Sequence, residues 1–184
     1  MPSCAPPGAT RKSVARRLGI GDGDGVTERF VLRIDGIDGD SVLDGHSDSI
    51  DVISWSWGVA RPTAPGSGST GRSGRPDFDD LHVAASISRA SPAIVESCVT
   101  GRRHRKAVLT GLRSSGDGQL VEFVEYELGD VSITSVEHGD TDDGPPIEEM
   151  SIDYRTLEIR YVSQRSDGSS GQTTGFSHDL NRSK

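Results

Sequence analysis

Aromatic side chains, cysteine and long apolar runs are all scarce in this sequence. Aromatic residues make up 5% of its 184 residues, and hydrophobic residues of every kind make up 32%. A hydrophobic content this low is unusual for a compact monomer. It favours long polar loops or a subunit that completes its burial by assembling with others. The length fits one domain of ordinary size with tails.

The missing apolar runs and the charge balance exclude several classes of protein. No segment is apolar enough to cross a bilayer, and residues 1–27 hold no hydrophobic stretch that would serve as a signal peptide. The pair Arg16-Arg17 precedes LGIGDGDG, where a twin-arginine signal requires an apolar region. The net charge of −8 argues against a general nucleic-acid binder. We therefore expect no membrane insertion, and assembly in the cytoplasm with export only by a machine that accepts folded protein.

Signatures of catalysis and of metal or cofactor binding are also missing. The five histidines show no HExxH spacing, and no GxSxG or Cys-His signature is present. Cys4 and Cys98 lack the spacing of metal ligands, and a structural disulfide between them is not expected. The Asp-rich segments 21–25 and 35–51 lack the twelve-residue calcium loop with its terminal glutamate, so solvated turns are the preferred interpretation. The sequence predicts no enzyme, no cofactor and no metal.

Two neighbouring segments alternate in polarity as strands do. Phe30, Leu32 and Ile34 point one way in the first segment, and Ile53, Trp55, Trp57 and Val59 point one way in the second. Two indoles on one face suit a core or a subunit contact better than a solvated surface. The candidate core or ring-interface residues are therefore Phe30, Ile34, Trp55 and Trp57.

The remaining pattern is that of an all-β barrel or sandwich with one short helix. Short alternating segments separated by Gly/Asp turns continue to residue 164. The helix is expected between Ser91, which could cap it, and Gly101, which could end it, with Pro92 in its first turn. Its predicted apolar stripe consists of Ile94, Val95, Cys98 and Val99.

Composition divides the chain into three zones and marks two long loops. We expect a flexible leader at 1–27, a folded domain at 28–164 and a polar, disordered tail at 165–184. The loop at 61–76 is either a linker or a contact to a partner. Its candidate contact residues are Arg61, Gly66, Gly68, Arg72 and Arg75. The acidic loop at 138–146 is either a solvated turn or a charged stacking contact.

The segment at residues 30–59 contains I-D-G-I, a charged loop and S-W-S-W-G, in that order. It closely resembles the haemolysin-coregulated proteins (Hcp), the ring-forming tube subunits of bacterial type VI secretion systems. Residues 78–113, 124–139 and 147–164 are similar to the same family, so the resemblance spans residues 29–164 in family order. The sequence departs from the family at its start, where most members begin almost directly with the first strand.

The resemblance implies a mainly β fold, namely a small antiparallel β-barrel of two sheets with one short flanking α-helix and an extended loop. Six subunits would close into a ring, and stacked rings would form a tube that carries effector proteins in its lumen. A contractile sheath, a spike and a baseplate would be its partners. Ring contacts are expected from Trp55, Trp57 and the sheet edges, and ring-to-ring contacts from residues 61–76.

Two other functions stay open at this point. One is the tube protein of a phage-tail-like extracellular injection particle, and the other is an Hcp-type effector carrier or binding module. Neighbouring genes for an inner-membrane complex would distinguish a secretion system from a free particle. The tails are short and polar for a folded toxin, which favours the structural subunit.

Overall fold

A computed structural model describes residues 28–61, 74–115, 118–141, 144–165 and 169–183 of the chain. In chain order its strands and helices are β1 (Glu28–Ile34), β2 (Ile50–Ser56), β3 (Val59–Ala60), β4 (Asp77–Phe78), β5 (Leu81–Ser86), α1 (Ser91–Thr100), β6 (Arg103–Ser114), β7 (Leu120–Thr141), β8 (Gly144–Asp153), β9 (Thr156–Gln164), β10 (Ser170–Asp179) and the 3-10 helix η2 (Leu180–Ser183). The predicted leader at 1–27 lies outside the described residues.

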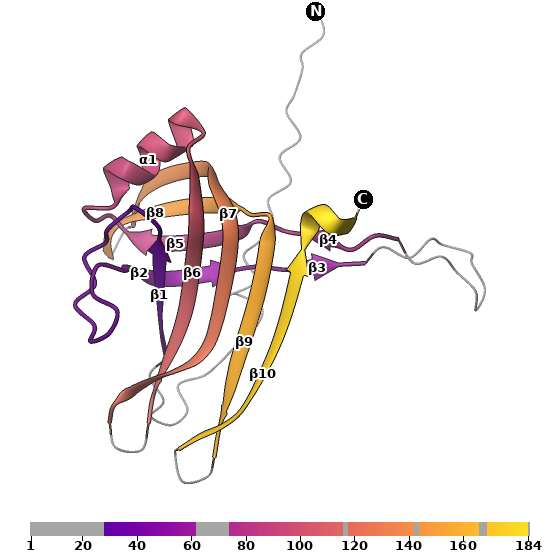
Figure 1. The fold of residues 1–184 in the computed structure, drawn as a ribbon. Helices are drawn as coiled ribbons and strands as arrows, with labels where there is room; N and C mark the ends of the chain where they lie inside the picture. The colour runs from indigo at the N-terminus through magenta and orange to yellow at the C-terminus, as the bar shows by residue number, and fades with distance from the viewer. Residues whose placement is uncertain (1–27, 62–73, 116–117, 142–143, 166–168, 184) are drawn as a thin grey trace, which may run out of the picture.

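Eight strands form one antiparallel sheet in the order β10-β9-β7-β6-β1-β2-β5-β8, and an additional β7–β8 pairing closes six of them into a barrel. Strands β9 and β10 extend the sheet beyond the barrel, and β3 and β4 form a separate two-stranded sheet beside it (Figure 1). Closure removes free edges from the barrel strands, which would otherwise pair with other chains. The predicted antiparallel barrel with one helix is confirmed.

The barrel is filled by aliphatic side chains. Leu32, Leu109, Leu128 and Ile152 are each at most 1% exposed and belong to one continuous cluster. They come from strands β1, β6, β7 and β8, so the core joins strands from both halves of the chain. On β1 the predicted face is confirmed, since Leu32 and Ile34 are buried and Phe30 packs against the cluster.

A β-bulge in β2 changes the predicted apolar face of this strand. The register between β2 and β5 shifts between Val52 and Ser54. Val52 therefore packs against the core together with Trp55, while Ile53 is 57% exposed. The prediction that Ile53 shares a face with the tryptophans is wrong, because one extra residue in a strand reverses the inward and outward positions around it.

Helix α1 ends as predicted but buries a different stripe. Gly101 closes it in the left-handed conformation, whereas Ala90 occupies the N-cap position without a side-chain cap bond. The hydroxyl of Ser91 instead accepts a hydrogen bond from the amide of Ser88 at 3.1 Å. The residues that the helix turns inward are Ala90, Ser91, Ile94 and Ser97, with Cys98 partly buried, while Val95 and Val99 are exposed.

The inward position of Ser97 has a polar cause. Its hydroxyl oxygen lies 3.0 Å from Nε2 of the buried His104, and Nδ1 of that ring lies 2.8 Å from the carbonyl oxygen of Asp35. A carbonyl oxygen can only accept, so Nδ1 carries the proton. A buried imidazole requires partners, and Ser97 is one that a count of apolar residues cannot reveal.

The predicted polar tail is an ordered part of the sheet. Residues 170–179 form β10, which pairs with β9 from Ser170↔Gln164 to Asp179↔Thr156. The amide of Leu180 then donates to the carbonyl of Arg155 at 2.9 Å. The expectation of a disordered segment after residue 164 is wrong, because an edge strand gains its order from backbone pairing and needs no apolar alternation.

Candidate assembly surface

The two tryptophans belong to an aromatic layer between the barrel core and the surface. Trp55 lies 5.4 Å from Phe30 and 5.1 Å from Tyr126, measured between ring centroids. The Trp57 ring lies 6.0 Å from the same Tyr126 ring. These are the offset and tilted distances at which aromatic pairs are stabilising. Both indoles are only partly buried in the single chain.

Trp57 is held by a short chain of hydrogen bonds. Its Nε1 donates to the hydroxyl of Tyr154 at 2.6 Å, and that hydroxyl donates to the carbonyl of Asp79 at 3.2 Å. Burial raises the pKa of Tyr154, so the phenol stays protonated and able to donate. The indole therefore has a fixed orientation at the barrel surface.

An apolar groove begins at Trp57 and continues over the extension of the sheet. It is lined mainly by Trp57, Val59, Phe78, Tyr161, Phe176 and His178. Phe176 is 52% exposed and Val59 51%, which are large exposures for such side chains. Exposed apolar surface that is this contiguous marks an interaction site more often than an ordinary surface.

The walls of this groove come from segments far apart in the sequence. The His178 ring stacks on Phe78 with centroids 5.0 Å apart, and Phe176 lies 6.2 Å from His178 on the same strand. Cross-strand pairing places Phe176 opposite Ile159. The groove exists only because β10 is ordered, so the polar sequence of that strand concealed it.

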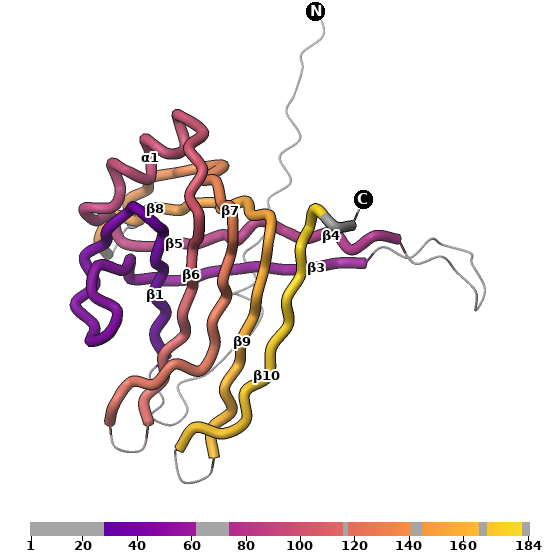
Figure 2. Tube along the Cα trace, in the orientation of Figure 1, coloured from indigo at the N-terminus to yellow at the C-terminus, as the bar shows by residue number. Residues whose placement is uncertain are grey.

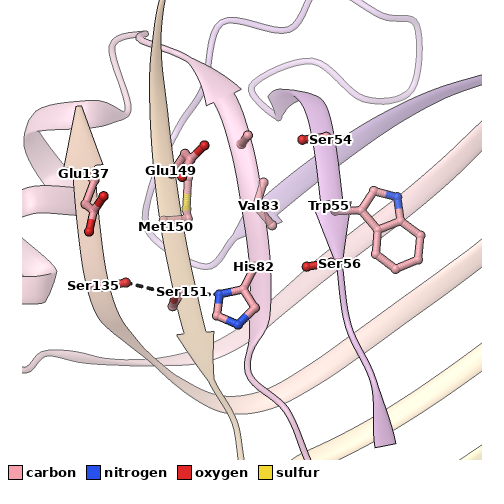
Figure 3. A pocket seen from close by; sticks show the side chains of 11 residues that line it. Ser54, Trp55, Ser56, His82, Val83, Ser135, Glu137, Glu149, Met150 and Ser151 are labelled. Atoms are coloured by element: carbon pink, nitrogen blue, oxygen red, sulfur yellow. Dashed lines mark hydrogen bonds between the residues drawn. The ribbon is translucent and has the colours of Figure 1, made fainter. Parts of the chain in front are cut away.

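A different surface, made of hydroxyl groups, covers the outer face of β2, β5, β8 and β7. In Figure 3, Ser54 and Ser56 point to this side of β2 and Trp55 points away from it. Ser135 donates to the hydroxyl of Ser151 at 2.9 Å, and Ser151 lies 2.8 Å from Nδ1 of His82. Glu137 and Glu149 complete this serine face, and Ala84 lies among its polar side chains.

The Asp-rich connection between β1 and β2 is organised by an arginine. Arg89 donates from Nε to the carbonyl of Gly39 at 2.6 Å, and its guanidinium pairs with Asp40 and Asp48. The Arg89 guanidinium thus neutralises the carboxylates that a metal cation would otherwise bind. Within the described part of the chain, no group of three or more His, Cys, Asp or Glu residues could hold a metal ion.

The predicted contact residues are distributed over several places. Phe30, Trp55 and Trp57 meet in the aromatic layer, and Ile34 is buried in the core. Of the loop residues, Arg61 lines the groove and Arg75 is exposed near β4, while Gly66, Gly68 and Arg72 lie outside the described residues. The helix residues Ser91, Pro92, Ile94, Val95 and Cys98 lie apart on α1. Sequence reasoning placed Val59 on the face of the tryptophans and missed Phe176, the groove residue on β10.

The comparison with protein families shows to which family this chain belongs. The model of the family described as type VI secretion system effector, Hcp, matches residues 31–161. The chain belongs to the Hcp family. Protein hcp1 of Pseudomonas aeruginosa is 27% identical to it over 138 residues, which cover 74% of this chain and 85% of the relative.

Solved structures of Hcp proteins have the same fold. Hcp1 from Salmonella typhimurium matches with a TM-score of 0.67 and 25% identity, covering 84% of this chain and 96% of that one. A structure described as a type six secretion system protein matches with a TM-score of 0.79 and 23% identity, covering 86% and 99%. The described residues contain no helix that is long and apolar enough to span a membrane.

Proposed function

We propose that this Hcp family member is the structural tube subunit of a type VI secretion system, and that six copies close into a ring whose stacked copies form the tube. The observation that carries the proposal is the exposed apolar groove between Trp57 and Phe176, whose walls include Val59 and Tyr161. When a second protein surface covers such a groove, its apolar side chains leave contact with water, and this burial stabilises the assembly.

A ring of identical subunits requires contacts between two different surfaces of each subunit. Closed cyclic assemblies larger than dimers use such heterologous contacts. The barrel has closed strands, and β10 at one end of the sheet remains available as an edge. The groove lies beside this edge, where a neighbouring subunit could cover apolar side chains and backbone groups together.

The serine face is suited to the lumen of such a tube. Its most exposed side chains are hydroxyls, one imidazole and two carboxylates, while Val83 and Met150 beneath them are buried, so a protein cargo would meet few apolar contacts on it. Strands β2 and β5, which carry part of this face, cross behind β6 in Figure 1. The tube would work by geometry, with energy supplied by a sheath, and no reaction is assigned to this chain.

Negative-stain electron microscopy of the purified full-length chain tests the ring directly. The proposal expects annular particles with six-fold symmetry and a stained centre. Compact particles without a centre at every protein concentration would contradict it. Neighbouring genes for an inner-membrane complex would favour the secretion system over a free, phage-tail-like injection particle.

The stacking role of loop 61–76 has a separate test. Replacing residues 66–74 with a short linker should leave single rings intact and weaken the stacking of rings into tubes. Tube length in micrographs of the wild-type and the shortened chain measures this difference. Equal tube formation by both proteins would remove the loop from the stacking contact.

A further inference from the structure

The connection at residues 36–49 presents one apolar side chain to solvent on a rigid support. Val42 is 93% exposed, whereas its neighbour Ser41 is 4% exposed. The amide of Gly39 donates to the carbonyl of Asp48 at 2.7 Å, and the amide of Ser41 donates to that of Ser49 at 2.9 Å. Internal hydrogen bonds between the two ends of a compact loop favour one conformation, so Val42 projects in a defined direction.

Three contacts anchor this Val42 loop (residues 36–49) to the barrel. Arg89 binds its two ends through Gly39 and Asp48. Arg33 donates to the carbonyl of Ser47 at 3.0 Å, and His46 lies 3.3 Å from Glu122. A Cβ atom at Gly39 would lie 2.2 Å from the carbonyl oxygen of Ser49, so this close approach of backbone requires glycine.

The Val42 loop and the apolar groove lie at opposite edges of the subunit. In Figure 1 the loop is the indigo segment at the far left, between β1 and β2, and the groove elements β3, β4, β9 and β10 are at the right. Figure 2 shows the same separation along the Cα trace. The loop cannot reach the groove of its own chain, but the loop of a neighbouring copy could.

The two surfaces are complementary in charge as well as in polarity. The loop carries Asp38 and Asp44, which form no ion pair within the described residues. The groove includes Arg61, and Arg75 is exposed beside it, next to the exposed Asp77 of β4. Opposite charges around an apolar contact orient two proteins and exclude wrong registers.

We propose that the Val42 loop of one copy packs into the apolar groove of the next copy and that this contact closes the ring. The proposal rests on the ring proposed above, and it names the two surfaces that build it. Repeated around an axis, a contact from one edge to the opposite edge produces a closed ring when the rotation from copy to copy closes, with each copy giving one loop and receiving another. Val42 would be the apolar anchor and the aspartates its charged rim.

The first test compares Val42→Asp with the matched control Val99→Asp. Val99 is 81% exposed on α1, on neither proposed surface, so both substitutions place a carboxylate at an exposed valine. Circular dichroism should show both variants folded. Sedimentation velocity should show at least about a tenfold weaker assembly for Val42→Asp and an unchanged assembly for Val99→Asp. Equal assembly of the two variants and the wild type would overturn the proposal.

The second test is a cross-link between copies. A chain with Cys4→Ser and Cys98→Ser, and with Val42→Cys and Phe176→Cys, should form covalent oligomers up to six copies on mild oxidation, and reduction should reverse them. The control with Val99→Cys in place of Val42→Cys should remain monomeric on a denaturing gel. Absence of cross-links in chains that form annular particles would contradict the contact.

These outcomes separate the contact from the ring itself. If the wild type forms no ring, the proposed function fails and the contact fails with it. If rings form while Val42→Asp assembles normally and no cross-link appears, the contact alone is wrong. If deletion of residues 1–27 exposes a cysteine placed at 176 to thiol reagents, the chain's own leader covers the groove and the contact is again wrong.

Discussion

The barrel interior and the apolar groove bury side chains in opposite ways. Leu109 and Ile152 are both 0% exposed within a single chain, whereas Phe176 and Tyr161 are 52% and 42% exposed. The interior is complete when one chain folds, but the groove has apolar walls that the described chain leaves in contact with water. Folding and assembly therefore depend on separate residues, so one substitution should impair folding alone and another should impair assembly alone.

The largest expected effect on folding is at the centre of the barrel. Leu109→Ala should lower the free energy of unfolding by about 2–5 kcal/mol, because it removes buried methyl groups and leaves a cavity. Urea denaturation followed by circular dichroism measures the loss. Val99→Ala is the control and should change stability by no more than about 0.5 kcal/mol, since its side chain is 81% exposed. Equal losses would mean that this core is not the centre of stability.

Trp57 joins the two regions and should have an intermediate effect. Trp57→Ala should cost about 3 kcal/mol, at the lower end for a large aromatic, because the indole is only partly buried. Tyr154→Phe keeps the packing and removes the acceptor of the indole N–H, which should cost about 1 kcal/mol. Thermal unfolding compares the two, and a near-neutral shift for Trp57→Ala would show that the indole contributes nothing to the fold.

Substitution of Phe176 should weaken assembly and leave folding stability almost unchanged, the opposite of what is expected for Leu109. Phe176→Ser should change the free energy of unfolding by less than about 1 kcal/mol, because half of the ring is already exposed. The same substitution should weaken assembly, which gel filtration over a range of concentrations measures. Leu120→Ser is the control, because Leu120 is 39% exposed on another part of the sheet. A Phe176 variant that unfolds easily and still assembles would show that Phe176 stabilises the fold and not the assembly.

The smallest effect is expected at a surface ion cluster on β7. The Arg103 side chain, which donates a hydrogen bond to Asp130, lowers the pKa of this carboxyl, and Arg155 adds to the effect. A lowered folded-state pKa stabilises the protein above the ordinary value of 3.8, and this contribution is lost as the pH falls through the folded-state pKa.

Asp130→Asn should therefore make the acid loss of stability shallower while it lowers the stability slightly at neutral pH. Asparagine tolerates the left-handed backbone at this position, where φ is 51°, so the substitution leaves the strand unstrained. Melting temperatures from about pH 5 to about pH 2 measure the slope. Identical slopes for the wild type and the variant would show that the pair has no role in acid stability.

The sequence predicted the barrel because its strands alternate clearly, as Phe30, Leu32 and Ile34 do. It did not predict the exposure of Ile53, because Ile53 alternates with Trp55 and Trp57 in an unbroken strand, and only the pairing with β5 shows the bulge that turns Val52 inward instead. The sequence placed Val95 in the buried stripe of α1 because that stripe was inferred from apolar residues alone. The helix instead turns the polar Ser97 inward, toward the buried imidazole of His104.

The groove was missed for a related reason. Strand β10 reads as a polar tail, and its one large apolar residue, Phe176, has no alternating partners in sequence. Its cross-strand partner Ile159 lies on β9, and His178 beside it stacks on Phe78 of β4. Surfaces built by edge strands depend on pairing over long distances in the chain, which local patterns do not contain.

Sedimentation equilibrium of the whole chain is the decisive experiment on the ring, because it gives the mass of the assembly without assuming its shape. The account predicts a species of six times the 19.6 kDa chain mass. It also predicts that this species dissociates in the Phe176→Ser variant while the variant chain remains folded. A wild-type chain that stays at the monomer mass over the whole accessible range of concentration would contradict the account.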